Sequence, residues 1–257
     1  MFVKLGFHYR CCKKCGVTYV SPMLCSNELL NSYEQSEFND NWMRTLMGEV
    51  EQKFNKPKFE LGIKQIEAAT GNKGKLLELG SAVGQFLEIS RKSGWDVHGI
   101  EFNSLGAEHC RNLGFEISQD PLGDESFSPQ MFDAVAMWEV LEHVISPREI
   151  VRNAARVMRK GGAILIVVPN VDSLAAQIMH QDCNMFRGTA HLTMFNADTL
   201  SELLKDEGFE ITHISTIISE ISVINNYLSF QDGYTGNSDY KNPIFDVLTE
   251  DFIHKNL

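Results

Sequence analysis

The chain has 257 residues, 43% of them hydrophobic and 22% charged, which suits one large α/β domain with accessory segments and argues against disorder. A formal net charge of −11 without an obvious basic patch argues against nucleic acid as the main partner. The longest apolar runs are far shorter than the roughly 20 residues that cross a bilayer, and the start lacks a signal-peptide pattern, so we expect a cytoplasmic protein with no membrane span.

The first 30 residues carry four of the six cysteines, Cys11, Cys12, Cys15 and Cys25. This crowding is unlike a disulfide framework spread over a chain of this size, and it fits reduced thiols. The stretch 12–16, CKKCG, is typical of a two-thiol knuckle that turns on its glycine. We therefore assign residues 1–30 to a separate cysteine-bearing segment.

Residues 31–72 are polar, with apolar positions at helical spacing that include Trp42, Phe54, Ile63 and Ile66. Pro57 interrupts this pattern, because proline lacks the N–H group that a helix interior needs. We predict two helices here, which cover the next domain.

Residues 73–220 alternate short β-rich runs with amphipathic helices. The predicted strands cover 76–79, 97–100, 115–117, 132–137, 163–168 and 209–217, and the predicted helices cover 85–93, 104–112, 147–159 and 198–207. Lys160-Gly161-Gly162 predicts the end of the third helix, and 169–195 is expected to be irregular. Such alternation predicts a mostly parallel sheet covered on both faces, with ligands at the carboxyl ends of its strands. The sequence leaves the structure of an extension at 221–257 open.

A glycine turn lies where the first of these strands meets the first helix, in the stretch 78–84, ELGSAVG. Gly80 and Gly84 would let a ligand approach the backbone, and the helix N-terminus offers N–H groups to an anion. A second acid, Glu101, ends the next strand, where its carboxylate can accept hydrogen bonds from a ribose. The alternatives are a turn whose glycines serve packing alone and a dinucleotide site.

The dinucleotide alternative is disfavoured by spacing. Such sites need Gly-x-Gly-x-x-Gly so that a pyrophosphate can lie on the helix, whereas here the middle position is Ala82. The turn also begins with an acid, Glu78, which suits an ammonium-bearing ligand better than a pyrophosphate.

Five sequence features together resemble class I S-adenosylmethionine-dependent methyltransferases of the ubiquinone-biosynthesis type, over roughly residues 75–217. They are the stretch 78–86 (ELGSAVGQF), Glu101, Phe132-Asp133, the stretch 140–144 (VLEHV) with Pro147, and the stretch 159–162 (RKGG). The resemblance implies a Rossmann-like, doubly wound sheet of seven strands with one antiparallel strand. It also implies S-adenosylmethionine as the cofactor and S-adenosylhomocysteine as the product.

The candidate cofactor-binding residues are Glu78, Gly80, Ser81, Ala82, Gly84, Phe86, Glu101, Phe102, Asp120 and Trp138. The resemblance implies that Gly80 and its neighbours Ser81 and Ala82 hold the methionine moiety and that Glu101 holds the ribose. It also implies that Phe102 packs near the adenine and that Asp120 approaches the adenine amine. Trp138 offers an aromatic face to a sulfonium or an adenine, with core packing as its alternative.

Both flanks of this core resemble a narrower group of methyltransferases that act on sugars and surface polysaccharides. The stretch 9–22 is similar to the second half of the zinc ribbon that precedes them, and the stretch 188–195 (GTAHLTMF) is similar to a segment that borders their acceptor pocket. A tetrahedral zinc needs four ligands, and here they would have to be His8, Cys12, Cys15 and Cys25, at irregular spacing. We expect free thiols and no metal, with bound zinc as the alternative.

His191 and His143 are the candidate catalytic residues, because an imidazole can take a proton near neutral pH if the acceptor must lose one. The alternative for His143 is a backbone-bonded histidine at a helix start. The sequence thus predicts methyl transfer to a small acceptor, most plausibly an oxygen of a sugar or nucleotide-linked sugar. A quinone-like or phenolic acceptor, or a cofactor-binding protein without catalysis, are the alternatives, and the oligomeric state stays open.

Overall fold

The computed structural model describes residues 2–23, 37–123 and 125–217. Its central feature is a five-stranded parallel sheet with the strand order β6-β5-β4-β7-β8. The strands are β4 (Lys75–Leu79), β5 (Asp96–Ile100), β6 (Glu116–Ser118), β7 (Phe132–Trp138) and β8 (Met158–Val167). Because β4 lies in the middle and the chain moves outward from it in both directions, the order reverses beside the carboxyl end of β4, the place where ligands bind in such sheets.

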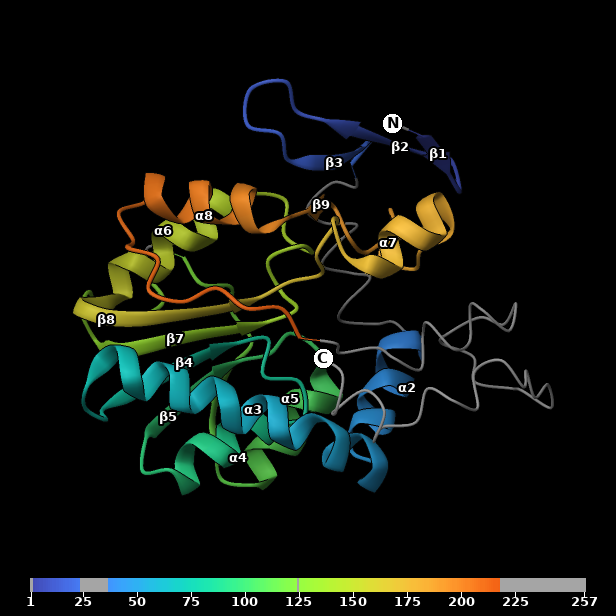
Figure 1. Ribbon diagram of the computed structural model, residues 1–257. Helices are drawn as coiled ribbons and strands as arrows, with labels where there is room; N and C mark the ends of the chain where they lie inside the picture. Colours follow the sequence, from blue (N-terminus) through green and yellow to red (C-terminus); the bar gives the residue numbers. More distant parts are fainter. Residues whose placement is uncertain (1, 24–36, 124, 218–257) are drawn as a thin grey trace, which may run out of the picture.

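Helices cover both faces of this sheet (Figure 1). One face carries α3 (Glu49–Thr70), α4 (Gln85–Lys92) and α5 (Ser104–Asn112), and the other carries α6 (Pro147–Val157) and α8 (Ala197–Asp206). Strands buried on both sides read as continuous apolar runs, and the side chains of β7 from Ala134 to Met137 are fully buried. The doubly wound α/β fold predicted from the alternating pattern is confirmed.

A second, four-stranded sheet lies over the carboxyl edge of the first. It consists of β1 (Phe2–Lys4), β2 (Phe7–Cys11), β3 (Thr18–Ser21) and β9 (Thr193–Met194), all antiparallel. Together with α7 (Leu174–Met179) and the short helix η1 (His180–Asp182), it encloses its own apolar cluster around the buried ring of Tyr9. The chain's beginning and the stretch 169–195 therefore fold as one unit, which the sequence did not predict.

The helical cover breaks at a different place from the predicted one. Helix α2 (Glu37–Leu46) ends before Gly48, whereas Pro57 lies inside the continuous helix α3. The proline removes a hydrogen bond to the carbonyl of Lys53, which lies at an exposed position where water can satisfy that group. Trp42 is 40% exposed and Phe54 is 45% exposed, so only the second half of the predicted apolar stripe covers the sheet.

Two other predicted boundaries are wrong. Lys160-Gly161-Gly162 lies within β8 and does not end α6, because the chain becomes extended already at Met158. The stretch 209–217 forms no strand, since no other described residue pairs with it in a ladder. The described residues thus hold five of the seven expected strands, and the extension at 221–257 lies outside them.

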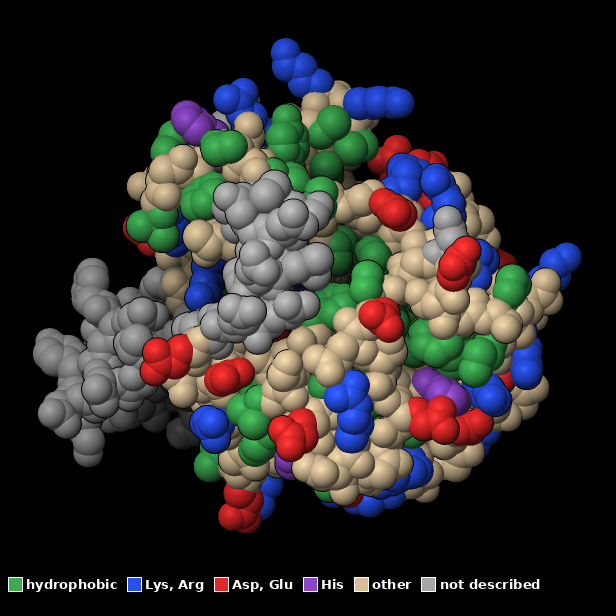
Figure 2. Space-filling view, turned by 180° about the vertical axis from the view of Figure 1, so that it is seen from behind, with side chains coloured by type: hydrophobic (Ala, Val, Ile, Leu, Met, Phe, Trp, Pro, Cys, Tyr) green, Lys and Arg blue, Asp and Glu red, His purple; other side chains and the backbone are tan. Residues whose placement is uncertain are grey.

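The surface carries charges of both signs. On the face turned away from the viewer of Figure 1, basic and acidic side chains are interspersed (Figure 2). None of the helices in the described part of the chain is long and apolar enough to cross a membrane.

Candidate functional site

The glycine turn after β4 forms at the centre of the sheet edge. Gly80 (φ +72°) and Gly84 (φ +77°) both adopt the left-handed conformation that glycine tolerates best. The N–H groups of Gly80 and Ser81 donate to the carbonyl of Ile100, 2.8 and 3.0 Å away, which ties the turn to the end of β5. A Cβ atom at Gly80 would lie 2.6 Å from Cγ2 of Val140, so the turn also passes closely under the loop after β7.

Two non-glycine residues at this edge share the left-handed conformation, Ala82 (φ +47°) and Glu139 (φ +55°). Such strain costs of order 1–3 kcal/mol at each position and concentrates where a ligand site needs an unusual backbone. The turns after β4 and β7 both contain such a strained residue, and the two turns lie side by side because these strands are neighbours.

Glu78 and Glu101 are both buried beside the turn. Oε2 of Glu101 accepts from the N–H of Ala82 at 2.7 Å, and Oε1 accepts from the N–H of Asn103 at 2.8 Å. Each carboxylate oxygen still has a lone pair for a ribose hydroxyl. Oε2 of Glu78 has no hydrogen-bond partner among the described residues, and burial, with the nearby Glu101, raises the pKa of Glu78 well above its usual range.

A further contact at the end of β5 has no counterpart among the sequence predictions. Asn103 caps α5 by accepting from the N–H of Gly106, and its side-chain amide donates to Asp40 of α2 at 2.9 Å. This bond links α2 to Asn103, whose N–H donates to the carboxylate of Glu101. Asparagine immediately before a helix is a typical N-cap signal, but its pairing with Asp40 is long-range and has no sequence signature.

The other candidate cofactor residues divide into two groups. Phe102 is partly buried against the sheet core, and Asp120 is exposed just beyond β6. Phe86 and Trp138 instead pack together with Phe59 of α3, with ring centroids 4.8 to 5.7 Å apart. The ring of Trp138 also lies against Gly62, where an added Cβ would come within 2.6 Å of it. The structure therefore places these two rings in the core under α3 and not at the turn.

The histidine pair meets at the other half of the same edge. His143 follows β7 and His191 precedes β9, and their ring centroids lie 4.8 Å apart. Nδ1 of His143 lies 3.0 Å from the carbonyl of Ala190, and Nδ1 of His191 lies 2.7 Å from that of Met185. Since a carbonyl only accepts, each Nδ1 carries the hydrogen and each Nε2 carries the lone pair. Two imidazoles from distant parts of the chain are thus held in the tautomer that has its hydrogen on Nδ1 and its lone pair on Nε2.

Glu142 completes this cluster. Its side chain is almost fully buried, and Oε1 lies 3.7 Å from Nε2 of His143. Its backbone carbonyl accepts from the N–H groups of Leu192 and Thr193, which joins the loop after β7 to the residues beside His191. Burial, with the nearby Glu139, raises the pKa of Glu142 well above its usual range.

Burial lowers the pKa of both histidines, that of His143 to about 3 and that of His191 to about 4. In the unfolded chain each imidazole gains a proton below about pH 6.5, whereas in the folded protein each stays neutral. Each histidine therefore makes folding less favourable as the pH falls from 6.5 toward its folded pKa, by up to about 1.4 kcal/mol per pH unit.

We expect His191→Asn to reduce this loss. Buried acids with raised pKa values, such as Glu142, oppose it over part of the same range, so the wild type alone does not isolate the histidine effect. Urea unfolding at pH 7.0 and 5.5 should show a smaller drop in the free energy of unfolding for the variant than for the wild type. An equal drop in both proteins would contradict the neutral, buried state of His191.

The cysteine knuckle lies apart from this edge, at the turn between β2 and β3. The polar N–H groups of Cys15 and Lys14 and the thiol of Cys15, all close to the sulfur of Cys12, lower the pKa of Cys12. Within the described residues, His8 does not join these thiols in a group of three possible ligands, and Cys25 lies outside the described part. The described residues thus supply two of the four ligands that a tetrahedral zinc needs.

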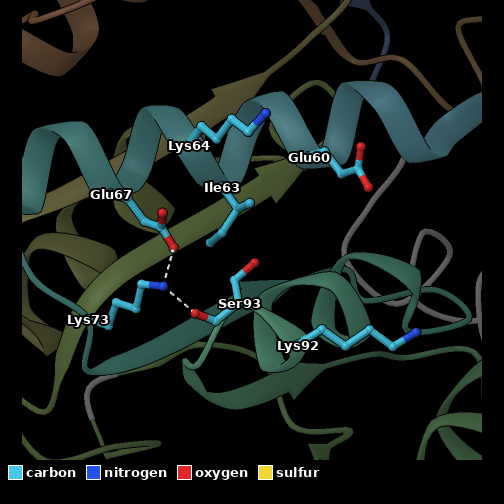
Figure 3. Close-up of a pocket in the computed structure, with 7 residues that line it drawn as sticks. All are labelled: Glu60, Ile63, Lys64, Glu67, Lys73, Lys92 and Ser93. Atoms are coloured by element: carbon cyan, nitrogen blue, oxygen red, sulfur yellow. Dashed lines mark hydrogen bonds and ion pairs between the residues drawn. The ribbon is translucent and has the colours of Figure 1, made fainter.

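A surface hollow of about 470 Å³ lies at the opposite end of the sheet (Figure 3). It is bordered by α3 and the end of α4, and Lys73 reaches across it to Glu67 and to the carbonyl of Ser93. Because Lys73 precedes β4 and Ser93 precedes β5, this hollow faces the amino ends of the strands. It is therefore separate from the edge that carries the turn and the histidines.

Comparison with known proteins finds relatives among methyltransferases. The methyltransferase domain family matches residues 31–214. The ubiquinone biosynthesis O-methyltransferase of Methylococcus capsulatus is 32% identical over 113 residues, covering 41% of this chain and 48% of that protein. A probable S-adenosylmethionine-dependent methyltransferase of Mycobacterium tuberculosis is 26% identical over 136 residues, covering 52% of this chain and 48% of the relative. The chain thus aligns with about half the length of these two curated relatives.

Among solved structures, the fold is similar to 1,6-didemethyltoxoflavin-N1-methyltransferase of Burkholderia thailandensis. The TM-score is 0.58 at 14% identity, with 83% of this chain and 92% of that chain covered, and that structure contains S-adenosylhomocysteine.

Proposed function

This chain belongs to the class I S-adenosylmethionine-dependent methyltransferases, and we propose that it transfers the methyl group to an oxygen of a small acceptor beside His143 and His191. The observation that carries this proposal is the pair of neutral, anchored imidazoles at the same sheet edge as the glycine turn. A cofactor site and two candidate bases would then share one edge.

The turn fits the cofactor's two polar ends. The missing Cβ at Gly80 lets the turn pass close to Val140, and the buried carboxyl of Glu78, whose Oε2 has no hydrogen-bond partner among the described residues, suits the ammonium group of the methionine moiety. At the end of β5, Glu101 would hold the ribose, with Phe102 near the adenine and Asp120 near its amine. We assign Phe86 and Trp138 a supporting role, because their rings stabilise α3 and α4 against the sheet.

The chemistry requires alignment first and a base second. S-Adenosylmethionine supplies a methyl group on a sulfonium, and displacement needs the acceptor atom in line with the methyl–sulfur bond. A hydroxyl acceptor also loses its proton. His191, held by Met185, and His143, held by Ala190, each present an Nε2 lone pair that can take this proton.

Two acceptor classes remain distinct hypotheses. The likeness of residues 9–22 and 188–195 to sugar-modifying methyltransferases favours a sugar or nucleotide-linked sugar, and these two segments pack together in the second sheet. The relative from Methylococcus capsulatus favours a quinone-like or phenolic acceptor, because its name assigns it to ubiquinone biosynthesis. We propose that residues 1–30 and 169–195 form the acceptor-side cover of the core at 73–220, next to the helical cover at 31–72.

Calorimetry with S-adenosylmethionine, S-adenosylhomocysteine and NAD tests the first step, with binding expected for the first two. Tight binding of NAD without binding of S-adenosylmethionine would overturn the proposal. Transfer from labelled S-adenosylmethionine to a panel of sugars, nucleotide sugars and phenols then separates the acceptor classes. Transfer to phenols alone would contradict the sugar hypothesis.

Replacing Glu101 by alanine should weaken S-adenosylmethionine binding about 10- to 100-fold, because hydrogen bonds to a charged group contribute roughly 1.5–3 kcal/mol. The exposed Glu108 on α5 provides the control, and Glu108→Ala should bind as the wild type does. Calorimetry measures both affinities. Equal affinity in Glu101→Ala and the wild type would remove the ribose role.

A further inference from the structure

The cluster of Glu142, His143 and His191 has the form of a metal site. Each residue offers one ligand atom, and the three atoms lie within 4.8 Å of one another. A tetrahedral ion with ligands at about 2.0–2.2 Å holds neighbouring donor atoms roughly 3.3 Å apart, so contraction by about 1.5 Å or less would close the set. We propose that these three side chains bind one divalent first-row transition-metal ion.

The anchoring of the imidazoles supports this assignment. Histidines that ligate metals usually donate their other ring N–H to a carbonyl or carboxylate, which fixes the ring and the tautomer. His143 and His191 both do so, to the carbonyls of Ala190 and Met185. The nitrogen left with a lone pair in each ring is therefore Nε2. Oε1 of Glu142 lies 3.7 Å from Nε2 of His143.

The carboxyl of Glu142 provides a second, independent observation. Glu142 is 1% exposed, and neither its Oε1 nor its Oε2 has a hydrogen-bond partner among the described residues. An unpartnered buried polar group costs free energy, so such groups usually have a partner or a bound ion. The two oxygens belong to the same side chain that lies beside the imidazoles, where a cation would satisfy them.

The donor set selects the class of ion. Two imidazoles and one carboxylate suit zinc, cobalt, nickel, manganese or iron, whereas magnesium and calcium prefer oxygen ligands alone. Three protein ligands also leave a fourth position on the ion for water or for an acceptor oxygen, as in catalytic zinc sites. The ion and a proton would compete for the same Nε2 lone pairs of His143 and His191.

Binding of this ion is separable from methyl transfer, so its test needs no acceptor. Cobalt(II) is titrated into the full chain and followed by visible absorption, with zinc and magnesium as competitors. The wild type should bind one cobalt ion per chain, displaced by zinc and not by magnesium. The same signal should persist in Cys12→Ser/Cys15→Ser, which removes the two thiols of the knuckle.

Variants of the cluster locate the ion. Glu142→Gln and His191→Asn should each weaken cobalt binding at least about 10-fold. His213→Gln replaces an exposed histidine and should leave binding unchanged. Calorimetry with S-adenosylmethionine and circular dichroism check that each variant is folded. If Glu142→Gln does not fold, His191→Asn still tests the proposal, because its amide can donate to the carbonyl of Met185 in place of Nδ1.

Loss of the cobalt signal in Cys12→Ser/Cys15→Ser would overturn the proposal, as would unchanged binding in folded His191→Asn. Displacement of cobalt by magnesium at equal concentration would contradict the transition-metal class. Failure of S-adenosylmethionine binding with intact cobalt binding would count against the proposed function alone.

Discussion

Gly80→Val is expected to weaken S-adenosylmethionine binding by at least about 100-fold, equivalent to about 3 kcal/mol. Valine at a φ of +72° is strained, because a β-branched residue in the left-handed region is a genuine outlier. Its Cβ would also meet Val140 at 2.6 Å, so either the turn or the loop after β7 must move. Calorimetry measures the affinity, and thermal unfolding measures the accompanying loss of stability.

A matched control separates the effect of Gly80→Val on the glycine turn from the effect of backbone strain alone. Gly161 has a φ of +79°, and a Cβ added to it meets no atom within 4 Å. Gly161→Val should therefore carry comparable backbone strain and bind S-adenosylmethionine as tightly as the wild type. If both variants lose binding equally, global destabilisation and not a local change at the glycine turn explains the effect of Gly80→Val.

His191→Ala is expected to leave S-adenosylmethionine binding intact and to lower kcat about 10²- to 10⁴-fold, which is the usual contribution of a positioned base. Binding and turnover should respond differently because the imidazole lies beside His143, on the proposed acceptor half of the edge, and not at the glycine turn. Single-turnover transfer of labelled methyl measures the chemical step. Unchanged turnover would remove His191 from the mechanism.

His191→Asn distinguishes chemistry from positioning. The asparagine amide can donate to the carbonyl of Met185 in place of Nδ1, but it lacks the Nε2 lone pair. If proton transfer is the role of His191, the Asn variant should be as slow as the Ala variant. Recovery of turnover in His191→Asn would show that anchoring of the loop is what matters, and His213→Ala should have no effect in either assay.

The parallel core could be predicted because its signals are local. The pattern of β4, the glycine turn and α4 occupies adjacent residues, and the predicted helix at 104–112 has the bounds of α5. The orientation of Trp138 could not be predicted in the same way. Residues of a strand buried on both faces are apolar throughout, so the sequence does not reveal which face its last residue joins. The packing of Trp138 on Gly62 follows from the position of α3, which is set by tertiary contacts.

The second sheet was missed for a different physical reason. Its strands have two to five residues, too short to show a period, and β9 has only Thr193 and Met194. Both candidate histidines were identified from sequence, yet their partnership with Glu142 depends on backbone bonds between that residue and Leu192. Long-range contacts of this kind leave no local pattern.

The pairing of β3 with β9 bears on how the protein is made. Thr18 lies opposite Met194, so a strand that leaves the ribosome early must wait for a partner that is synthesised near the end of the described chain. Closing so long a loop is entropically costly and slow compared with forming local contacts. The parallel core can therefore assemble during translation before His191 is held in place, and formation of the proposed acceptor edge becomes a late, separately observable folding event.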